Sequence, residues 1–193
     1  MKEHLYNMSV ATRHQFLIDK IMEHKPKTAL EIGAGRGIIA IAISKLGVDV
    51  RAIDKNPKYI VEETEANQFL GGSVTFELGD VFRHVFTNKF DVVFSQGFIH
   101  HFPNGRLFEL LRKYTCIGTW NIHSVPSEKH PAPPSRTKFF KKDEVERFLS
   151  CEQWSKLLRP FKPIVCDYSH DLEGVYSGKV IEGASICLSI RKI

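Results

Sequence analysis

Glycine recurs at every second position early in this chain. Gly33, Gly35 and Gly37 follow the apolar stretch Leu30-Glu31-Ile32, and a helical segment comes after them. Glycine lacks a Cβ, so it allows both a tight strand-to-helix turn and close approach of a ligand to the main chain. Three alternate glycines are hard to explain by packing alone. We therefore expect a strand, a glycine turn and a helix, with a cofactor lying against the turn.

The spacing of the glycines indicates which cofactor. A dinucleotide-binding fold would have G-x-G-x-x-G, but Ile38 stands at the third glycine position. The spacing Glu31-x-Gly33-x-Gly35-x-Gly37 instead resembles the first motif of Rossmann-like, class I S-adenosylmethionine-dependent methyltransferases. That resemblance implies that Glu31 and the three glycines, with Ala34 between them, shape the methionine side of an S-adenosylmethionine site.

The next two strands agree with this resemblance. Residues 48–53 read as a second strand that ends at Asp54, whose carboxylate would accept hydrogen bonds from the ribose hydroxyls, with Lys55 beside it. Residues 74–78 read as a third strand followed by Gly79-Asp80-Val81. In similar enzymes this aspartate meets the adenine amino group and the next residue contacts the ring, which implies those roles for Asp80 and Val81. Taken alone, Asp54 could cap a helix before Pro57, and Gly79-Asp80 could be an ordinary turn.

The fourth strand, within residues 90–102, looks like the corresponding motif of small-molecule methyltransferases. The resemblance places Ser95 and Gln96 near the methionine and the transferred methyl group, and His100 and His101 just beyond. A histidine has an ordinary pKa of about 6.5, so either could act as general base, although we expect one of two adjacent histidines to pack or cap. The pair lacks a metal-ligand spacing, and we expect no metal site. The segment also departs from the N-P-P-Y and D-P-P-Y motifs of amino methyltransferases that act on DNA bases.

The chain length of 193 residues fits one domain, and we expect residues 1–193 to form a single methyltransferase domain. Residues 1–27 would be an N-terminal helical segment and a candidate cover of the active site. Helices alternate with strands, which predicts an α/β fold with a mostly parallel sheet. The resemblance implies a doubly wound seven-stranded sheet of order 3-2-1-4-5-7-6, with an antiparallel last strand.

The remaining elements follow from local patterns. A substrate loop is expected where three prolines follow the fifth strand. The predicted helices are residues 12–24, 37–46, 57–70, 104–114 and one or two within 141–158; the predicted strands are residues 116–124, 163–168 and 181–190; and the predicted substrate loop is residues 126–136.

Composition limits the cellular location and the classes of binding partner that we expect. The four cysteines form no C-x-x-C pair, so we expect buried, reduced thiols. The sequence has neither a signal-peptide core nor an apolar run long enough to span a bilayer, which predicts a cytoplasmic protein without a membrane partner. A formal net charge of +5 slightly favours an acidic substrate and leaves RNA as a partner open.

The function predicted from these observations is S-adenosylmethionine-dependent methyl transfer, by in-line displacement, to a nucleophile on a small organic acceptor. Holding two reactants in line supplies roughly 7 to 11 kcal/mol, so a general base is often secondary. Three alternatives remain: an RNA- or tRNA-directed methyltransferase, a non-catalytic methyltransferase-like binding protein, and a nicotinamide-dependent oxidoreductase. The acceptor atom and the oligomeric state are left open by the sequence.

Overall fold

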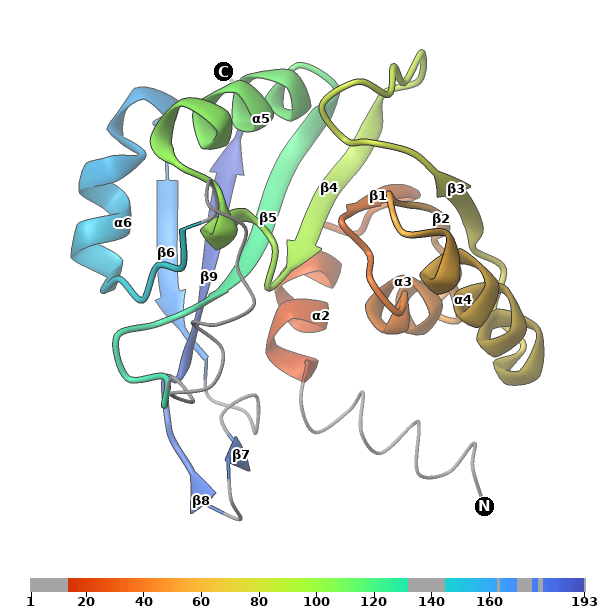
Figure 1. The fold of residues 1–193 in the computed structure, drawn as a ribbon, viewed down its shortest axis with the longest axis horizontal. Coiled ribbons are helices and arrows are strands. Elements are labelled where there is room, and N and C mark those ends of the chain that lie inside the picture. The colour runs from red at the N-terminus through yellow and green to blue at the C-terminus, as the bar shows by residue number, and fades with distance from the viewer. Residues whose placement is uncertain (1–13, 132–144, 163, 170–174, 177–178, 193) are drawn as a thin grey trace.

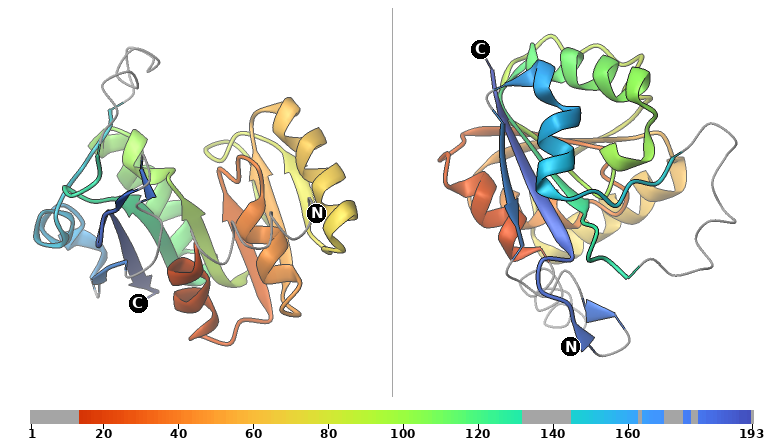
Figure 2. Two further views of the ribbon diagram at one scale, coloured as in Figure 1. Left: turned by 90° about the horizontal axis from the view of Figure 1, so that it is seen from below. Right: turned by 90° about the vertical axis from the view of Figure 1, so that its left-hand side faces the viewer.

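The computed structural model describes residues 14–131, 145–162, 164–169, 175–176 and 179–192, and these form a seven-stranded sheet with helices on both faces (Figures 1 and 2). A separate two-stranded sheet pairs β7 (Val175–Tyr176) with β8 (Lys179–Val180). The strands of the main sheet are β1 (Thr28–Ile32), β2 (Asp49–Asp54), β3 (Thr75–Leu78), β4 (Phe90–Gln96), β5 (Gly118–Pro126), β6 (Ile164–Tyr168) and β9 (Ser185–Arg191).

The strand order is β3-β2-β1-β4-β5-β9-β6. Pairing is parallel from β3 through β5, whereas β9 is antiparallel to both β5 and β6. Because β9 is the seventh strand of this sheet in chain order, the predicted order 3-2-1-4-5-7-6 and the antiparallel last strand are confirmed. The carboxyl ends of the parallel strands therefore meet at one edge of the sheet, where ligands of such folds bind.

Two apolar cores lie on the two faces of the sheet. One contains side chains of α5 and α6, such as Leu107 and Trp154, and the other contains side chains of α2, α3 and α4, such as Leu17, Ile41 and Leu70. None of the described helices is long and apolar enough to cross a membrane. The helices are α2 (Gln15–Met22), α3 (Ile38–Ser44), α4 (Pro57–Leu70), α5 (Asn104–Thr115) and α6 (Cys151–Leu157), with 3-10 turns η1 (Ile99–His101) and η3 (Arg159–Phe161).

The prediction for the C-terminal third is wrong in part. Within the described part of the predicted helical region 141–158, only α6 is α-helical, and residues 145–150 have no regular structure. They run beside η1 instead: the Val145 N–H donates to the His101 carbonyl, and Arg147 Nη2 donates to the Phe102 carbonyl. Residues 132–144, which include part of the predicted substrate loop, lie outside the described residues, as does Thr12 of the opening helix.

The expectation of reduced, buried cysteines is also corrected. Cys151 and Cys166 form a disulfide that joins the start of α6 to β6, with Cα atoms 5.6 Å apart. Neither Cys116 nor Cys187 takes part in the disulfide; Cys116 is exposed and Cys187 is buried. The error arose because the packing of α6 on β6 brings Cys151 and Cys166 together, and no sequence spacing shows that packing.

Candidate functional site

The glycine turn between β1 and α3 has a backbone that few other residues could adopt. Gly33, Gly35 and Gly37 have φ angles of 64°, 57° and 59°, all in the left-handed region that side chains disfavour. The turn is fixed to β2, because the N–H groups of Gly33 and Ala34 both donate to the Ile53 carbonyl. The alternation seen in the sequence is therefore an alternation of left-handed residues.

Asp54 lies at the carboxyl end of β2, beside the glycine turn. One carboxylate oxygen accepts from the Gly35 N–H at 2.9 Å, and the other accepts from the Asn56 N–H at 2.9 Å. Each carboxylate oxygen has two lone pairs, so both can still accept a further donor such as a ribose hydroxyl. Asn56, rather than Asp54, caps α4 by accepting from the Lys58 N–H. Asp54 therefore orders the turn and keeps capacity for a ligand.

Asp80 and Val81 follow β3 and are fixed by the chain around them. Asp80 Oδ1 accepts from the Phe82 N–H at 2.9 Å. The Val81 carbonyl accepts from Lys113 Nζ at 2.8 Å and from the Tyr114 hydroxyl at 2.9 Å. Burial raises the pKa of Tyr114, so this hydroxyl stays a donor at neutral pH. Two residues of α5 thus hold the segment that follows β3.

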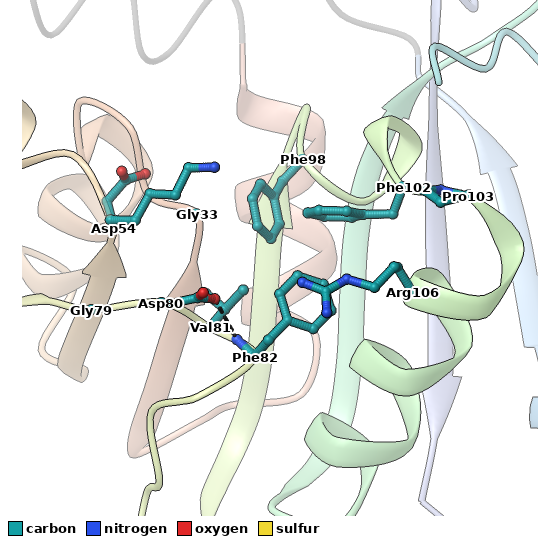
Figure 3. A pocket seen from close by; sticks show the side chains of 11 residues that line it. Gly33, Asp54, Gly79, Asp80, Val81, Phe82, Phe98, Phe102, Pro103 and Arg106 are labelled. Atoms are coloured by element: carbon teal, nitrogen blue, oxygen red, sulfur yellow. Dashed lines mark hydrogen bonds between the residues drawn. The ribbon is translucent and has the colours of Figure 1, made fainter. Parts of the chain in front are cut away.

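A cavity of about 420 Å³ opens between these segments (Figure 3). The volume lies within the roughly 300–1,000 Å³ typical of small-molecule sites. The predicted residues that line it are Gly33, Asp54, Lys55, Asp80 and Val81. They lie at the end of β2 or just after β1, β2 and β3, so the structure brings together residues that the sequence placed at three successive strand ends.

The other wall of the cavity is aromatic and was missed by the sequence prediction. Phe98 and Phe102 meet edge to face at 5.0 Å between ring centroids, and Phe102 meets Phe82 at 5.2 Å. The Arg106 guanidinium carbon lies 3.5 Å from the centroid of the Phe82 ring. Pro103 completes this wall. Phe98 and Phe102 flank the two histidines in the sequence, and that spacing was the signal available.

The remaining predicted residues do not line the cavity. Ser95 is fully buried, and its hydroxyl lies 2.9 Å from His123 Nδ1. Gln96 is exposed at the end of β4. His100 is buried and His101 is half-buried on η1, with ring centroids 3.8 Å apart. The two rings therefore pack on each other, and the methyl-side roles of these four residues stay predictions.

His123 faces Ser95 across the β4–β5 pair and is completely buried. Burial lowers the pKa of His123 to about 3, so the imidazole is neutral at physiological pH. A group so hard to protonate is a poor general base. His123 acts instead as a neutral hydrogen-bonding partner that fixes Ser95.

A buried carboxyl group lies beneath the glycine turn. Glu31 Oε2 accepts from the Ala40 N–H in the first turn of α3 at 3.1 Å. Burial raises the pKa of Glu31 well above its usual range, the Ala40 N–H opposes the shift, and the charges of Glu63 and Asp54 add to it. Glu31 thus joins β1 to α3 rather than lining the cavity.

These residues fit S-adenosylmethionine. Asp54 offers acceptors for a ribose diol and Asp80 an acceptor for an amino group. Val81 and the phenylalanines offer apolar surface for a flat base. A Cβ at Gly35 would meet no atom within 4 Å, so the turn presents open backbone to a ligand. No group of three or more His, Cys, Asp or Glu side chains in the described ranges is arranged to hold a metal ion.

Comparison with known proteins agrees with this fit. Residues 29–116 match the methyltransferase domain family. A putative protein N5-glutamine methyltransferase of Methanocaldococcus jannaschii is 38% identical over 79 residues, 40% of this chain and 39% of that protein. The mitochondrial ubiquinone biosynthesis O-methyltransferase of Schizosaccharomyces pombe is 26% identical over 176 residues, 78% of this chain and 63% of that protein. The chain thus spans less than two thirds of either relative.

The fold recurs in solved methyltransferases. Magnesium protoporphyrin IX methyltransferase from Synechocystis PCC 6803, crystallised with S-adenosylhomocysteine, superposes with a TM-score of 0.68 at 16% identity, covering 93% of this chain and 83% of that one. The matched domain spans β1 through α5, the part of the chain that builds the cavity. The fold of this chain is therefore the Rossmann-like fold of these methyltransferases.

Proposed function

We propose that this protein transfers a methyl group from S-adenosylmethionine, by in-line displacement, to a nucleophile on a small organic acceptor. The observation that carries the proposal is the convergence of Gly33, Asp54 and Asp80, from three strand ends, on one cavity. When bound, S-adenosylmethionine supplies an electrophilic methyl group on a sulfonium sulfur that is a good leaving group.

The chain's own contribution is binding and orientation. Asp54 holds the ribose, Asp80 and Val81 hold the adenine, and the glycine turn lets the cofactor approach the main chain. Each of these groups is already fixed: Asp54 to the turn, Asp80 to the Phe82 N–H and Val81 to α5. A site that needs no rearrangement on binding loses less free energy to ordering its side chains.

A small acceptor is supported by the surroundings of the cavity. Phe98, Phe102 and Pro103 bring apolar surface to the cavity from the segment after β4, where the methyl group would be delivered. The S. pombe relative is named an O-methyltransferase of ubiquinone biosynthesis, whereas the M. jannaschii relative is named for protein glutamine. The match to the first covers 78% of this chain and the match to the second 40%. The longer match favours a small molecule.

His101 is the better candidate for a general base. It is half-buried, whereas His100 is almost completely buried and His123 is held neutral by burial. A phenol or alcohol acceptor would need its proton removed, and a histidine beside the methyl group can remove it at neutral pH. His101→Asn should then lower kcat and flatten the pH–rate profile, while the affinity for S-adenosylhomocysteine stays unchanged.

Calorimetric titration with S-adenosylhomocysteine tests the cofactor site. Asp54→Ala should weaken binding by at least about tenfold, because two hydrogen bonds to a carboxylate are lost. Asp49→Ala is the matched control, since Asp49 is exposed at the other end of β2 and lines no part of the cavity. NAD should not bind. Binding of NAD alone, or no binding of either ligand, would overturn the proposal.

Transfer itself requires a second experiment. Protein incubated with S-adenosylmethionine carrying a labelled methyl group is screened against phenols, catechols, carboxylic acids and thiols. The label should pass to one acceptor class and should not pass when Asp54→Ala protein is used. Binding of the cofactor without transfer to any acceptor, including glutamine-containing peptides and RNA, would favour a non-catalytic binding protein.

A further inference from the structure

Glu63 is a buried carboxyl group that the proposed function does not use. It projects from α4 and has no exposed surface. Neither of its carboxyl oxygens has a hydrogen-bond partner among the described residues. Burial of a carboxylate in this way is energetically unfavourable, because the group loses its hydration and no hydrogen-bond donor replaces the water. Such a side chain in the interior calls for a physical explanation.

Glu63 lies directly behind the third glycine of the turn. Its Cγ is 3.2 Å from the position of a Cβ at Gly37, and the Phe76 ring of β3 is 2.6 Å from that position. Gly37 also has a left-handed φ of 59°. Any side chain at this position would collide with Phe76 and crowd Glu63. The third glycine therefore allows the turn to lie close to a buried acid.

The charged groups around Glu63 are mostly negative. Glu31 approaches from β1, and Asp54 approaches from the end of β2. The charge of Asp54 raises the pKa of Glu63, and the charges of Glu63 and Asp54 raise the pKa of Glu31. Phe76, from β3, is apolar. Arg36, the basic residue of the turn, is exposed and pairs with Glu62 on the outer side of α4. Three acids from three elements thus surround the glycine turn, and no described ion pair joins any of them to a cation.

We propose that Glu63 is a specificity residue that ionises when a cationic cofactor lies on the glycine turn, so that the site prefers the sulfonium cofactor to its neutral thioether product. The inference rests on the proposed function. Without ligand, the carboxyl group keeps its proton because of burial and the charge of Asp54. A positive sulfonium nearby stabilises the carboxylate, and the proton passes to solvent. S-adenosylhomocysteine lacks the sulfonium and gives no such stabilisation.

This arrangement would help turnover. The cofactor carries one more positive charge than the product. Because the Glu63 carboxylate forms only when the cofactor is bound, it strengthens binding of the cofactor and not of the product. The discrimination must increase with pH, because a proton is released only when the cationic ligand binds. After transfer the positive charge on the ligand is gone, Glu63 takes a proton back, and the product is held less tightly.

The test measures proton release during ligand binding. Sinefungin, in which an ammonium replaces the sulfonium, serves as a chemically stable cationic ligand, and S-adenosylhomocysteine serves as the neutral one. Each is titrated calorimetrically at pH 7 in two buffers that differ in ionisation enthalpy. Wild-type protein should release roughly half a proton more with sinefungin than with S-adenosylhomocysteine. Glu63→Gln should abolish most of that difference.

Affinity provides the second readout. The preference for sinefungin over S-adenosylhomocysteine should rise about three- to tenfold from pH 6.5 to pH 8.5 in wild type and less than twofold in Glu63→Gln. Protonation of the ligands' own groups affects wild type and Glu63→Gln equally, because both proteins bind the same ligands, so it cancels when the two proteins are compared. Glu65→Gln is the matched control, as Glu65 is exposed on the same helix. Glu63→Met, which also cannot titrate, replaces the Gln variant should that one not fold.

The possible failures are separable. If wild type binds neither ligand, the proposed function fails. If it binds both with equal proton release, or if Glu63→Gln keeps the full pH dependence, the cofactor site stands and the role of Glu63 is wrong. Neither reading depends on the identity of the methyl acceptor.

Discussion

The ring of Phe98 occupies the space where a side chain at Gly33 would lie. Gly33 directly follows β1 with a φ of 64°, and Phe98 directly precedes η1. The aromatic wall of the cavity therefore rests on the first glycine of the turn, and both line the cavity (Figure 3). Two independent constraints, backbone conformation and close approach of a ring, explain glycine at this position.

Replacing Gly33 with alanine should be costly on both counts. The left-handed backbone costs roughly 1–2 kcal/mol for a residue with a Cβ, and displacement of the Phe98 ring adds to that. We expect a loss of at least about 2 kcal/mol in the free energy of unfolding and at least about a tenfold loss of affinity for S-adenosylhomocysteine. Denaturant unfolding and calorimetry measure the two effects.

Two other glycines allow the cost of the left-handed backbone to be measured separately from the cost of displacing the Phe98 ring. Gly35 and Gly47 have φ angles of 57° and 89°, yet a Cβ at either would meet no atom within 4 Å. Alanine at either site should carry only the backbone cost of roughly 1–2 kcal/mol. Adding Phe98→Ala to Gly33→Ala should recover part of the lost stability. If Gly33→Ala is no worse than Gly47→Ala, contact with Phe98 is unimportant.

The position of the two aspartates at the carboxyl edge of the sheet could be predicted from the sequence. Asp54 and Asp80 stand at the ends of strands whose pairing is parallel, so strand assignment alone placed them at one edge of the sheet. The fold followed from the same pattern, with the resemblance supplying the strand order. Local patterns of this kind survive folding, because a buried parallel strand leaves its next residue at the carboxyl edge of the sheet.

The aromatic wall and Glu63 could not be predicted in the same way. Where the Phe98 ring points depends on how the segment after β4 packs against Gly33, and a phenylalanine in the sequence is equally compatible with the core. Glu63 lies in a helix rich in glutamates, and only the approach of Gly37 and Phe76 distinguishes it from exposed Glu65. Features set by packing between distant segments leave no periodic signal in the chain.

Reduction of the Cys151–Cys166 disulfide should lower stability without weakening cofactor binding. The bond closes a sequence separation of 15 residues, for which chain entropy predicts about 3 kcal/mol. It joins α6 to β6, which lies at the opposite edge of the sheet from β3 (Figure 1), and neither cysteine lines the cavity. Unfolding with and without reductant, compared with a Cys151→Ser/Cys166→Ser variant, measures the loss.

Cys116→Ser controls for the remaining exposed thiol. The reductant should change the stability of this variant as much as that of wild type, and should leave the double variant unchanged. A reductant effect that persists in the double variant would assign the stabilisation elsewhere. Affinity for S-adenosylhomocysteine should agree within about twofold across all these proteins.

Asp91 should contribute stability that disappears in acid. Its Oδ2 accepts from the Lys27 and Thr28 N–H groups at 2.8 and 3.0 Å, joining the start of β4 to the start of β1. These bonds lower the pKa of Asp91 below its ordinary value of 3.8. With a lowered pKa in the folded state, the contribution is complete above about pH 4 and is lost as pH falls through the folded value.

The variant Asp91→Asn should therefore be about 1–2 kcal/mol less stable than wild type at pH 7, at the low end of the range for hydrogen bonds to a charged group because Asp91 is only half-buried. The difference should shrink steadily below about pH 4, where Asp91 takes up a proton. Asp49→Asn, exposed at the start of β2, serves as the control. Urea unfolding from pH 2.5 to pH 7 checks both variants, and a gap independent of pH would show that charge is not the cause.

Glu63 should impose the opposite pH dependence on the unliganded protein. Burial, together with the charge of Asp54, raises the pKa of Glu63 from 4.5 to about 8. Between these values the folded chain keeps a proton that the unfolded chain has released, so stability falls as pH rises through this window and is unaffected below it. Glu63→Gln removes this titration. Between pH 5 and pH 8 its free energy of unfolding should therefore rise, relative to that of wild type, by at least about 1 kcal/mol.

The measurement is urea unfolding of wild type, Glu63→Gln and Glu65→Gln at intervals from pH 4.5 to pH 8.5, without cofactor. Glu65→Gln should follow wild type, because that side chain is exposed. Saturating sinefungin should reduce the advantage of Glu63→Gln at pH 8, since a bound cation stabilises the carboxylate that the variant lacks. A constant difference between Glu63→Gln and wild type across this range would mean that Glu63 is already ionised in the folded protein, and its proposed response to the cofactor charge would fail.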